Sequence, residues 1–166
     1  DKARGHGYHP MYAEIMDKIG RKNELRLLEI GLGTNGVQFV SNMGSNGRPG
    51  ASHRSWEAYL PNAAIFGAEI DKNVLFQEGR IRTTYADQLN MSSMEDMYKE
   101  FGAEPFDVII DDALHNVAGQ LNTLLFGLEH LRRPGWICVE DVQDNFFQAY
   151  RLVEFYLRQY NSYHPL

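Results

Sequence analysis

A run of glycines directly after a short apolar segment constrains this chain more than any other feature. Residues 25–30 are mostly apolar and predict a buried strand. Gly31, Gly33 and Gly36 follow, and glycines let the backbone turn sharply and lie close to a ligand because they carry no Cβ. Their spacing matches the G-x-G-x-x-G pattern of dinucleotide-binding turns, although a glycine-rich turn without a ligand matches it too.

Length, charge and cysteine content exclude several classes of protein. The 166 residues suffice for one domain with a substantial core. The net charge is −6, and nucleic-acid binding needs a basic face, so we expect no nucleic-acid partner. No apolar run approaches the ~20 residues of a membrane span, so no membrane partner is expected either. The single cysteine, Cys138, cannot form an internal disulfide, which suits a reducing, cytoplasmic compartment.

Strands and helices are expected to alternate along the rest of the chain. A helix is expected to begin at Val37–Val40, a surface loop over 41–50 and a turn over 133–135. Because strands alternate with helices, we predict an α/β fold with a parallel sheet and right-handed crossovers. The pattern predicts helices over 11–19, 52–59, 92–101, 117–131 and 145–160, and strands over 63–70, 81–85, 106–110 and 136–139.

Acidic residues follow most of the predicted strands. The carboxyl ends of parallel strands lie along one edge of the sheet, where ligands gather, so these acids are expected to share a site. One acidic strand end would mean little, but a row of them favours a metal ion, or a ligand with hydroxyl groups and positive charge. In chain order the acids are Glu69, Asp87, Asp111, Asp112, Glu140 and Asp141.

The chain resembles class I S-adenosylmethionine-dependent methyltransferases. Residues 27–36 are similar to the first motif of that family, and 66–71, 86–87, 106–112 and 131–136 are similar to the segments that follow it. The resemblance covers about residues 25–142 and implies a Rossmann-like doubly wound parallel sheet. We therefore expect one methyltransferase domain over 1–166, with an N-terminal lid and helix (1–24), a cofactor-binding core (25–142) and a C-terminal helix (143–166).

One departure from the family pattern concerns the end of the sequence. Full class I domains have two more strands after the fifth helix, and this sequence ends at Leu166, before they would occur. Either the sequence is an excised core or residues are absent from it.

The resemblance implies S-adenosylmethionine as cofactor. Gly31 and Gly33 would pass beneath its methionine part, and Asp87 would approach its adenine. Glu69 would bind the ribose hydroxyls, because a carboxylate can accept two hydrogen bonds from a vicinal diol. The full set of implied cofactor-binding residues is Glu29, Gly31, Gly33, Glu69, Asp71, Asp87 and Asp111.

A narrower resemblance points to a metal ion. Residues 110–115 and 139–143 are similar to metal-dependent O-methyltransferases that act on sugars of macrolide antibiotics, and residues 1–12 are similar to the entry segment of that group. This implies a divalent ion, expected to be magnesium, which prefers oxygen ligands and keeps waters that a substrate diol can displace. The implied metal ligands are Asp111, Glu140 and Asp141.

His115, three residues after Asp112, is the candidate general base. Its unperturbed pKa of about 6.5 lets it accept a proton near neutral pH, and a metal-bound hydroxyl is easier to deprotonate. The resulting oxygen would attack the methyl carbon in line with sulfur, and we assign catalytic roles to His115 and Asp112. The alternative for this pair is a capped helix start with a hydrogen-bonded histidine.

Several other residues are candidates or are set aside. His6, Tyr8 and His9 are candidates to line the site, with a solvated terminus as the alternative, whereas His53 and His164 are expected in solvent. The last predicted helix is apolar nearly all round, so we expect it to be buried or to meet a partner, with a homo-oligomer as one possibility.

The predicted function is O-methyl transfer to a hydroxyl of a small molecule, of the sugar or polyketide type. A nicotinamide-dependent oxidoreductase is one alternative, but its acid follows the glycines by about 20 residues. Here Glu69 lies 33 residues after Gly36, which favours a methyl donor. A non-catalytic methyltransferase-like binding domain is the other alternative.

Overall fold

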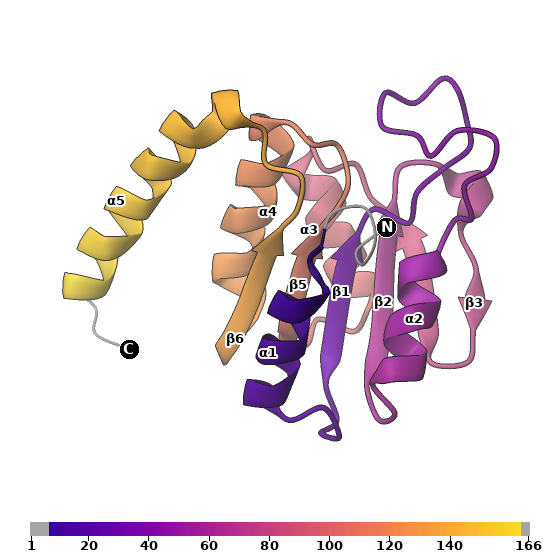
Figure 1. The fold of residues 1–166 in the computed structure, drawn as a ribbon, viewed down its shortest axis with the longest axis horizontal. Helices are drawn as coiled ribbons and strands as arrows, with labels where there is room; N and C mark the ends of the chain where they lie inside the picture. Colours follow the sequence, from indigo (N-terminus) through magenta and orange to yellow (C-terminus); the bar gives the residue numbers. More distant parts are fainter. Residues whose placement is uncertain (1–6, 164–166) are drawn as a thin grey trace.

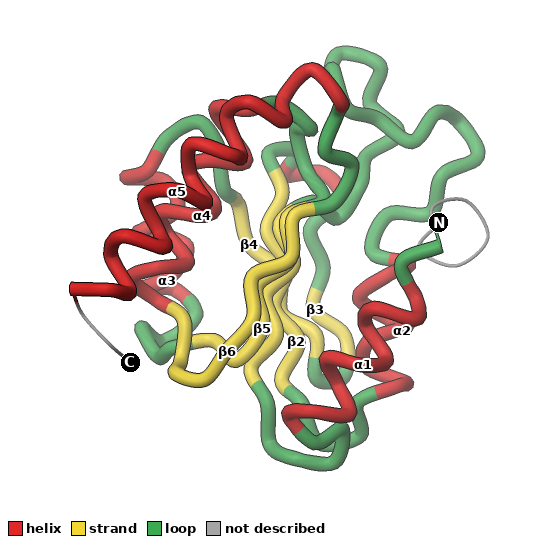
Figure 2. The backbone as a smooth tube through the Cα atoms, turned by 60° about the vertical axis from the view of Figure 1, so that its left-hand side comes forward, coloured by secondary structure: helices red, strands yellow, loops and turns green. Residues whose placement is uncertain are grey.

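The computed structural model describes residues 7–163, which form three layers (Figures 1 and 2). A six-stranded sheet lies in the middle, with α1 and α2 on one side and α3, α4 and α5 on the other. The helices are α1 (His9–Ile19), α2 (Ala51–Tyr59), α3 (Met91–Glu100), α4 (Val117–His130) and α5 (Phe147–Tyr163), with short 3₁₀ turns η1 (Lys72–Val74) and η2 (Asp144–Phe146).

The sheet has the doubly wound order β3-β4-β2-β1-β5-β6. All neighbouring strands pair in parallel except β3 and β4. The chain moves outward from β1 to β2 and β4 and then returns to β5 on the other side of β1. Ligands in such sheets bind where this direction reverses, beyond the carboxyl ends of the strands. The strands are β1 (Arg26–Ile30), β2 (Ala64–Glu69), β3 (Gln77–Glu78), β4 (Ile81–Tyr85), β5 (Phe106–Asp111) and β6 (Leu131–Val139).

Alternation along the strands builds a separate core on each face of the sheet. Leu27 in β1 packs with Met16 of α1, whereas its neighbour Leu28 belongs to the opposite core with Met94 of α3 and Phe126 of α4. All five side chains are fully buried, and each such burial contributes about 1.5–3 kcal/mol. The two cores hold the helices against the sheet and fix the edge where the strand ends meet.

The expected α/β fold is confirmed, with local corrections. Residues Val37–Val40 form no helix, and the side chains at both ends of that stretch are almost fully exposed. β6 begins at Leu131 rather than Trp136, although a register shift loops out the residues between them. β3 was not expected. α3 begins at Met91 rather than at residue 92, because the side chain of Asn90 caps it by accepting a hydrogen bond from the backbone N–H of Ser93 at 3.3 Å.

α5 is less buried than its composition predicts. Phe147, Leu152, Phe155 and Tyr156 are all more than half exposed, so the expectation of a buried helix is wrong for these side chains. A role for α5 in meeting a partner stays a prediction. Among residues 7–163, none of the helices combines the length and the apolar character needed to cross a membrane.

Candidate functional site

The glycine turn after β1 lies directly against the residue that follows β5. Gly31 has a φ of 106°, and a Cβ at this position would overlap the backbone carbonyl of Asp112. The N–H of Gly31 donates to the carbonyl of Ala68 at 2.8 Å, and the N–H of Asp112 donates to the carbonyl of Ile30 at 2.9 Å. The close approach therefore requires a glycine and brings the turn beside the acidic end of β5.

The Glu69 carboxylate, at the end of β2, holds the glycine turn through hydrogen bonds to backbone N–H groups. Its Oε2 accepts hydrogen bonds from the N–H groups of Leu32 and Gly33, both at 3.1 Å, and its Oε1 accepts from those of Ile70 and Asp71 at 2.8 and 3.3 Å. An ionised carboxylate offers about four acceptor positions, and four backbone groups take them here. In this conformation Glu69 holds the turn, and ribose hydroxyls would have to replace some of these bonds.

Asp71 fixes the next residues of the turn. Its carboxylate accepts the hydroxyl hydrogen of Thr34 at 2.5 Å and the backbone N–H of Asn73 at 3.0 Å, and these bonds lower the pKa of Asp71. The carbonyl of Thr34 in turn accepts the N–H of Met43 at 2.8 Å. Met43 therefore lies over Gly33, where a Cβ would overlap its sulfur.

Glu29 and His53 lie in a buried cluster between β1 and α2. Glu29 Oε2 accepts the indole N–H of Trp56 at 2.8 Å, and His53 Nδ1 lies 3.9 Å from the same oxygen. His53 is fully buried, so the expectation that it is solvated is wrong. The reason is Gly67 in β2, whose missing Cβ leaves the space that the His53 ring fills.

A cavity of about 1070 Å³ opens between α1, α2, the glycine turn and the carboxyl ends of β5 and β6. Ligand pockets commonly measure ~300–1,000 Å³, so this cavity has room for a nucleotide-sized cofactor together with an acceptor. The aromatic residues Tyr12, Trp56 and Tyr59 line it together with His9 and residues of the loop over 41–48. The predicted site residues that line it are Gly31, Gly33, Asp112, His115, Glu140 and Asp141.

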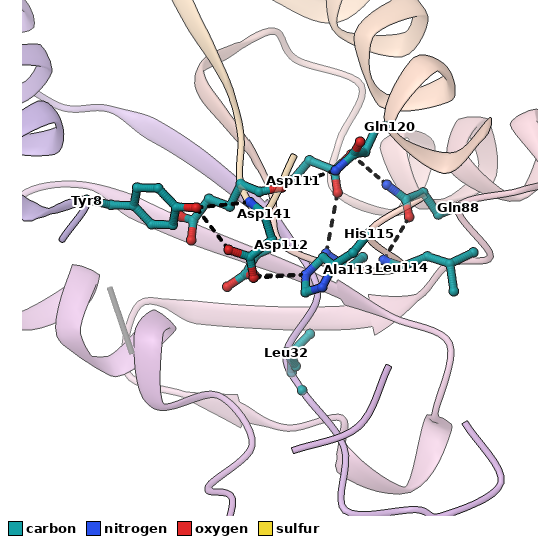
Figure 3. Close-up of polar contacts among 12 residues, drawn as sticks. Tyr8, Leu32, Gln88, Asp111, Asp112, Ala113, Leu114, His115, Gln120 and Asp141 are labelled. Carbon is teal, nitrogen blue, oxygen red and sulfur yellow. Dashed lines mark hydrogen bonds and ion pairs between the residues drawn. The ribbon is translucent and has the colours of Figure 1, made fainter. Parts of the chain in front are cut away.

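At one end of the cavity, two carboxylates lie near the same nitrogen of His115 (Figure 3). His115 Nε2 lies 3.3 Å from Asp112 Oδ1 and 3.7 Å from Asp141 Oδ2, and all three side chains are about three-quarters buried. Hydrogen bonding to Asp112 raises the pKa of His115, with the Asp141 charge adding to the effect. The protonated imidazole is therefore favoured while both acids are ionised.

Backbone strain is concentrated at this end of the cavity. His115 and Asp141 both have a φ of 51°, in the left-handed region that residues with a Cβ seldom adopt. Such conformations cost about 1–3 kcal/mol each and persist only where surrounding contacts hold them. Strain at two adjacent members of one polar cluster is typical of a functional site.

Two tyrosines from the N-terminal segment reach the same end. The Tyr8 hydroxyl donates to Asp141 Oδ1 at 2.9 Å and accepts the backbone N–H of Asp141 at 3.1 Å. The Tyr12 hydroxyl donates to the Glu140 carboxylate. Burial is the largest cause of a raised pKa at both tyrosines, so both remain protonated donors near neutral pH. His6 and His164, two further histidines named from the sequence, lie outside the described residues.

Asp111 and Asp87 do not line the cavity. Asp111 is fully buried, and its Oδ2 accepts the side-chain N–H of Gln88 at 2.6 Å (Figure 3). Burial raises the pKa of Asp111. Asp87 Oδ1 accepts the backbone N–H of Leu89 at 2.9 Å in the turn before α3. Glu29, Glu69 and Asp71 likewise lie behind the cavity wall.

The donor set at the acidic end suits a hard divalent cation. One ligand atom each from Asp112, His115 and Asp141 lies within 4.8 Å of the others, and Glu140 is next in the chain. Carboxylate oxygens are the ligands that magnesium prefers. Of the three ligands expected from the sequence, Glu140 and Asp141 lie at this end, and Asp112 occupies the position expected of Asp111.

Known proteins with similar sequences are sugar O-methyltransferases. The chain is 31% identical over 130 residues to L-olivosyl-oleandolide 3-O-methyltransferase of Streptomyces antibioticus, across 78% of this chain and 31% of that enzyme. It is 30% identical over 146 residues to demethylmacrocin O-methyltransferase of Streptomyces fradiae, across 87% and 34%. The chain thus spans about a third of the length of these curated relatives. No protein-family model matches it.

Solved structures agree with this similarity. The MycE methyltransferase of the mycinamycin biosynthetic pathway, in complex with Mg and SAH, aligns with a TM-score of 0.71 at 26% identity, over 89% of this chain and 35% of that one. A second MycE complex, which also contains mycinamycin VI, aligns with a TM-score of 0.69 at 28% identity, over 84% and 35%.

Proposed function

This chain is a distant homologue of the macrolide-sugar O-methyltransferases, which are class I S-adenosylmethionine-dependent enzymes, and on that premise we propose that it catalyses metal-assisted O-methyl transfer. The methyl group of S-adenosylmethionine passes to a hydroxyl oxygen of the acceptor, and S-adenosylhomocysteine and a proton are released. The observation that carries the proposal is that one cavity joins the glycine turn to the cluster of Asp112, His115 and Asp141.

The cofactor is proposed to bind along the glycine turn. Gly31 and Gly33 expose backbone in the cavity, and the other residues assigned to the cofactor act by shaping that wall. Glu69 and Asp71 hold the turn, and Glu29 holds Trp56 in place. The ribose contact of Glu69 and the adenine contact of Asp87 are proposed only for a conformation in which their present backbone bonds are exchanged. Asp111 is proposed to support Gln88 rather than to touch the cofactor.

Asp112, Glu140 and Asp141 are proposed to hold the metal ion, with Asp112 in place of Asp111. All three line the cavity and supply carboxylate oxygens, whereas Asp111 is buried behind them. Bound magnesium would offset the charge of these carboxylates and lower the pKa of the acceptor hydroxyl.

His115 is proposed to take the proton from the acceptor hydroxyl, in a state in which bound magnesium would offset the charges of Asp112 and Asp141 that favour its protonated form. Its Nε2 faces the carboxylates that would orient the acceptor, and general-base catalysis of this kind contributes about 10²–10⁴-fold in rate. Tyr12, Trp56 and Tyr59, which line the cavity, are proposed to align the acceptor with the donor. Alignment supplies a large part of the acceleration in two-substrate reactions.

The acceptor is proposed to be a sugar hydroxyl of a natural product. The similar MycE structure contains mycinamycin VI, and the similar enzymes carry the names of glycosylated macrolides and tetracenomycins, which supports this class. A polyketide hydroxyl of an aglycone is the other acceptor of this type.

Calorimetry followed by a transfer assay tests the proposal. We expect S-adenosylhomocysteine to bind in the micromolar range and NAD to give no heat, which would exclude the oxidoreductase alternative. Radiolabelled S-adenosylmethionine with magnesium and a panel of glycosylated macrolides should then label an acceptor, and EDTA should abolish labelling. Cofactor binding without transfer to any acceptor would support the alternative of a binding domain.

A further inference from the structure

Two hydroxyl groups, one from Tyr12 in α1 and one from Tyr8 just before that helix, contact the acidic end of the cavity. Tyr8 and Tyr12 are four residues apart, a spacing that places side chains above one another on one face of a helix. Their partners, Asp141 and Glu140, are consecutive residues at the end of β6. Two tyrosines four residues apart thus bind two adjacent residues at the end of β6, which lie more than 120 positions away in the sequence.

The contact between Tyr8 and Asp141 is double. The hydroxyl donates to Oδ1 of Asp141 at 2.9 Å and accepts the N–H of the same residue at 3.1 Å. One oxygen atom therefore fixes the carboxylate relative to its own backbone. That backbone lies in the left-handed region, with a φ of 51°, and needs outside contacts to stay there.

The second oxygen of Asp141 has a different role. While Oδ1 is held by Tyr8, Oδ2 faces the cluster and lies 3.7 Å from Nε2 of His115 (Figure 3). The two oxygens of an ionised carboxylate are equivalent, so a half-turn would change nothing, but a smaller rotation would turn the free face of the carboxylate away from His115. The hydrogen bond from the Tyr8 hydroxyl opposes that smaller rotation because it would be broken.

We propose that Tyr8 is a positioning residue for Asp141, which it holds with one oxygen toward the cavity so that the cluster binds a divalent cation more tightly. The inference rests on the proposed function, which supplies the cation. Partners that hold metal ligands typically change metal affinity by about 10–100-fold when they are removed. Tyr12 is less suited to a test because it is almost fully buried and packs edge-on against Trp56.

Binding of Mn²⁺ to the 166-residue chain tests this inference without any assay of activity. Electron paramagnetic resonance measures free Mn²⁺ directly. We expect Tyr8→Phe to raise the Kd for Mn²⁺ by about 10-fold or more, because the ring stays and only the hydroxyl is lost. The metal-free thermal midpoint should change by no more than about 3 °C, since Tyr8 is only partly buried. Tyr156→Phe, on an exposed tyrosine of α5, is the matched control and should bind Mn²⁺ as the unmodified chain does.

A double-mutant cycle separates positioning from a general structural effect. We expect Asp141→Asn to weaken Mn²⁺ binding, and Tyr8→Phe to cause little further loss in that background, because its target is already gone. An equal loss in both backgrounds, or unchanged affinity of Tyr8→Phe, would overturn the inference and leave the proposed function standing. Failure of the unmodified chain to bind millimolar Mn²⁺ would overturn the proposed metal site and the inference together.

Discussion

His115 is the residue on which the proposed chemistry depends most. Its Nε2 lies within 4 Å of two carboxylates, its backbone is strained, and its ring lines the cavity. Replacing it by alanine removes the base but none of the residues at the glycine turn. We therefore expect His115→Ala to lower the rate of methyl transfer by about 10²–10⁴-fold, with the affinity for S-adenosylhomocysteine changed less than about threefold.

The measurement is single-turnover transfer together with calorimetry of the variant. His130 offers a comparison, because it pairs with Glu95 at 2.7 Å and stacks on Tyr98 away from the cavity. His130→Gln should keep the transfer rate within about threefold. A His115→Ala variant that transfers at the full rate would refute the assignment of the base.

The sequence could predict that acids gather here, but not which of two adjacent acids faces the cavity. Asp111 ends β5 and Asp112 follows it, and successive side chains of an extended chain point to opposite sides. An error of one residue in the predicted end of the strand therefore exchanges which of the two aspartates is expected to face the cavity. The prediction for His53 failed for a related reason, because the space that buries it is created by Gly67, on a different element.

The pairing of His53 with Gly67 leads to a stability prediction. A Cβ at position 67 would overlap the His53 ring, and overpacking of a core costs about 1–3 kcal/mol. We expect Gly67→Ala to lower the free energy of unfolding by about this amount, measured by urea denaturation. His53→Ala should lower it too, since it leaves a cavity. Because each change relieves the other, the double variant should lose less than the sum of the two, and strict additivity would contradict the contact.

At the scale of elements, the glycine turn is held by acids rather than by its own sequence. Glu69 binds four backbone N–H groups, and Asp71 binds the hydroxyl of Thr34. The strand–glycine pattern was enough to place the turn and the strand before it. It gave no sign that these acids would bind the turn itself, because hydrogen bonds across 37 residues of sequence depend on how β1 and β2 pair.

Asp71 makes the stability of this turn depend on pH. Its pKa in the folded chain is lowered from 3.8, chiefly by the Thr34 hydroxyl and then by the N–H of Asn73. A lowered pKa means that the carboxylate adds stability above pH 3.8 and that this contribution is lost as the pH falls through the folded value. We expect Asp71→Asn to be less stable than the unmodified chain at pH 7, with the difference shrinking below pH 3.8.

Urea denaturation between pH 7 and pH 2.5 measures that difference. Thr34→Val removes the largest cause of the shift while keeping a side chain of similar size. In that background the pH-dependent part of the Asp71→Asn effect should be smaller. A difference that stays constant across this range would show that the Asp71 carboxylate has no lowered pKa.

For two short segments, the local sequence pattern did not predict the secondary structure. Three of the four residues in Val37–Val40 are apolar, yet the segment forms a turn with Val37 89% exposed, because the glycine-rich neighbours on both sides give no helix to extend. The two-residue strand β3 has no periodicity to detect and exists only through pairing with β4. Both cases concern short segments, whose structure is decided by contacts made elsewhere.

For the molecule as a whole, alternation of elements predicted a parallel α/β sheet, and the family resemblance implied its doubly wound order. Parallel strands need crossovers, and right-handed crossovers on both sides of β1 leave few possible orders for the sheet. The cavity lies where that order reverses, between the ends of β1 and β5. Which side chains meet at the cavity depends on contacts between elements, such as those of Tyr8 and Tyr12 with the residues after β6, and no single element predicts these contacts.

α5 gives the last prediction, because it carries apolar surface on the outside of the molecule. Phe147, Leu152, Phe155 and Tyr156 are exposed along it, and exposed patches of this kind are typical of contact sites. We expect the chain to associate with a second copy through α5, and Phe155→Glu to shift its sedimentation toward the monomer without altering cofactor binding. Val37→Glu adds the same charge at a more exposed position outside α5 and should leave sedimentation unchanged. A chain that sediments as a monomer at 100 µM would refute this use of the helix.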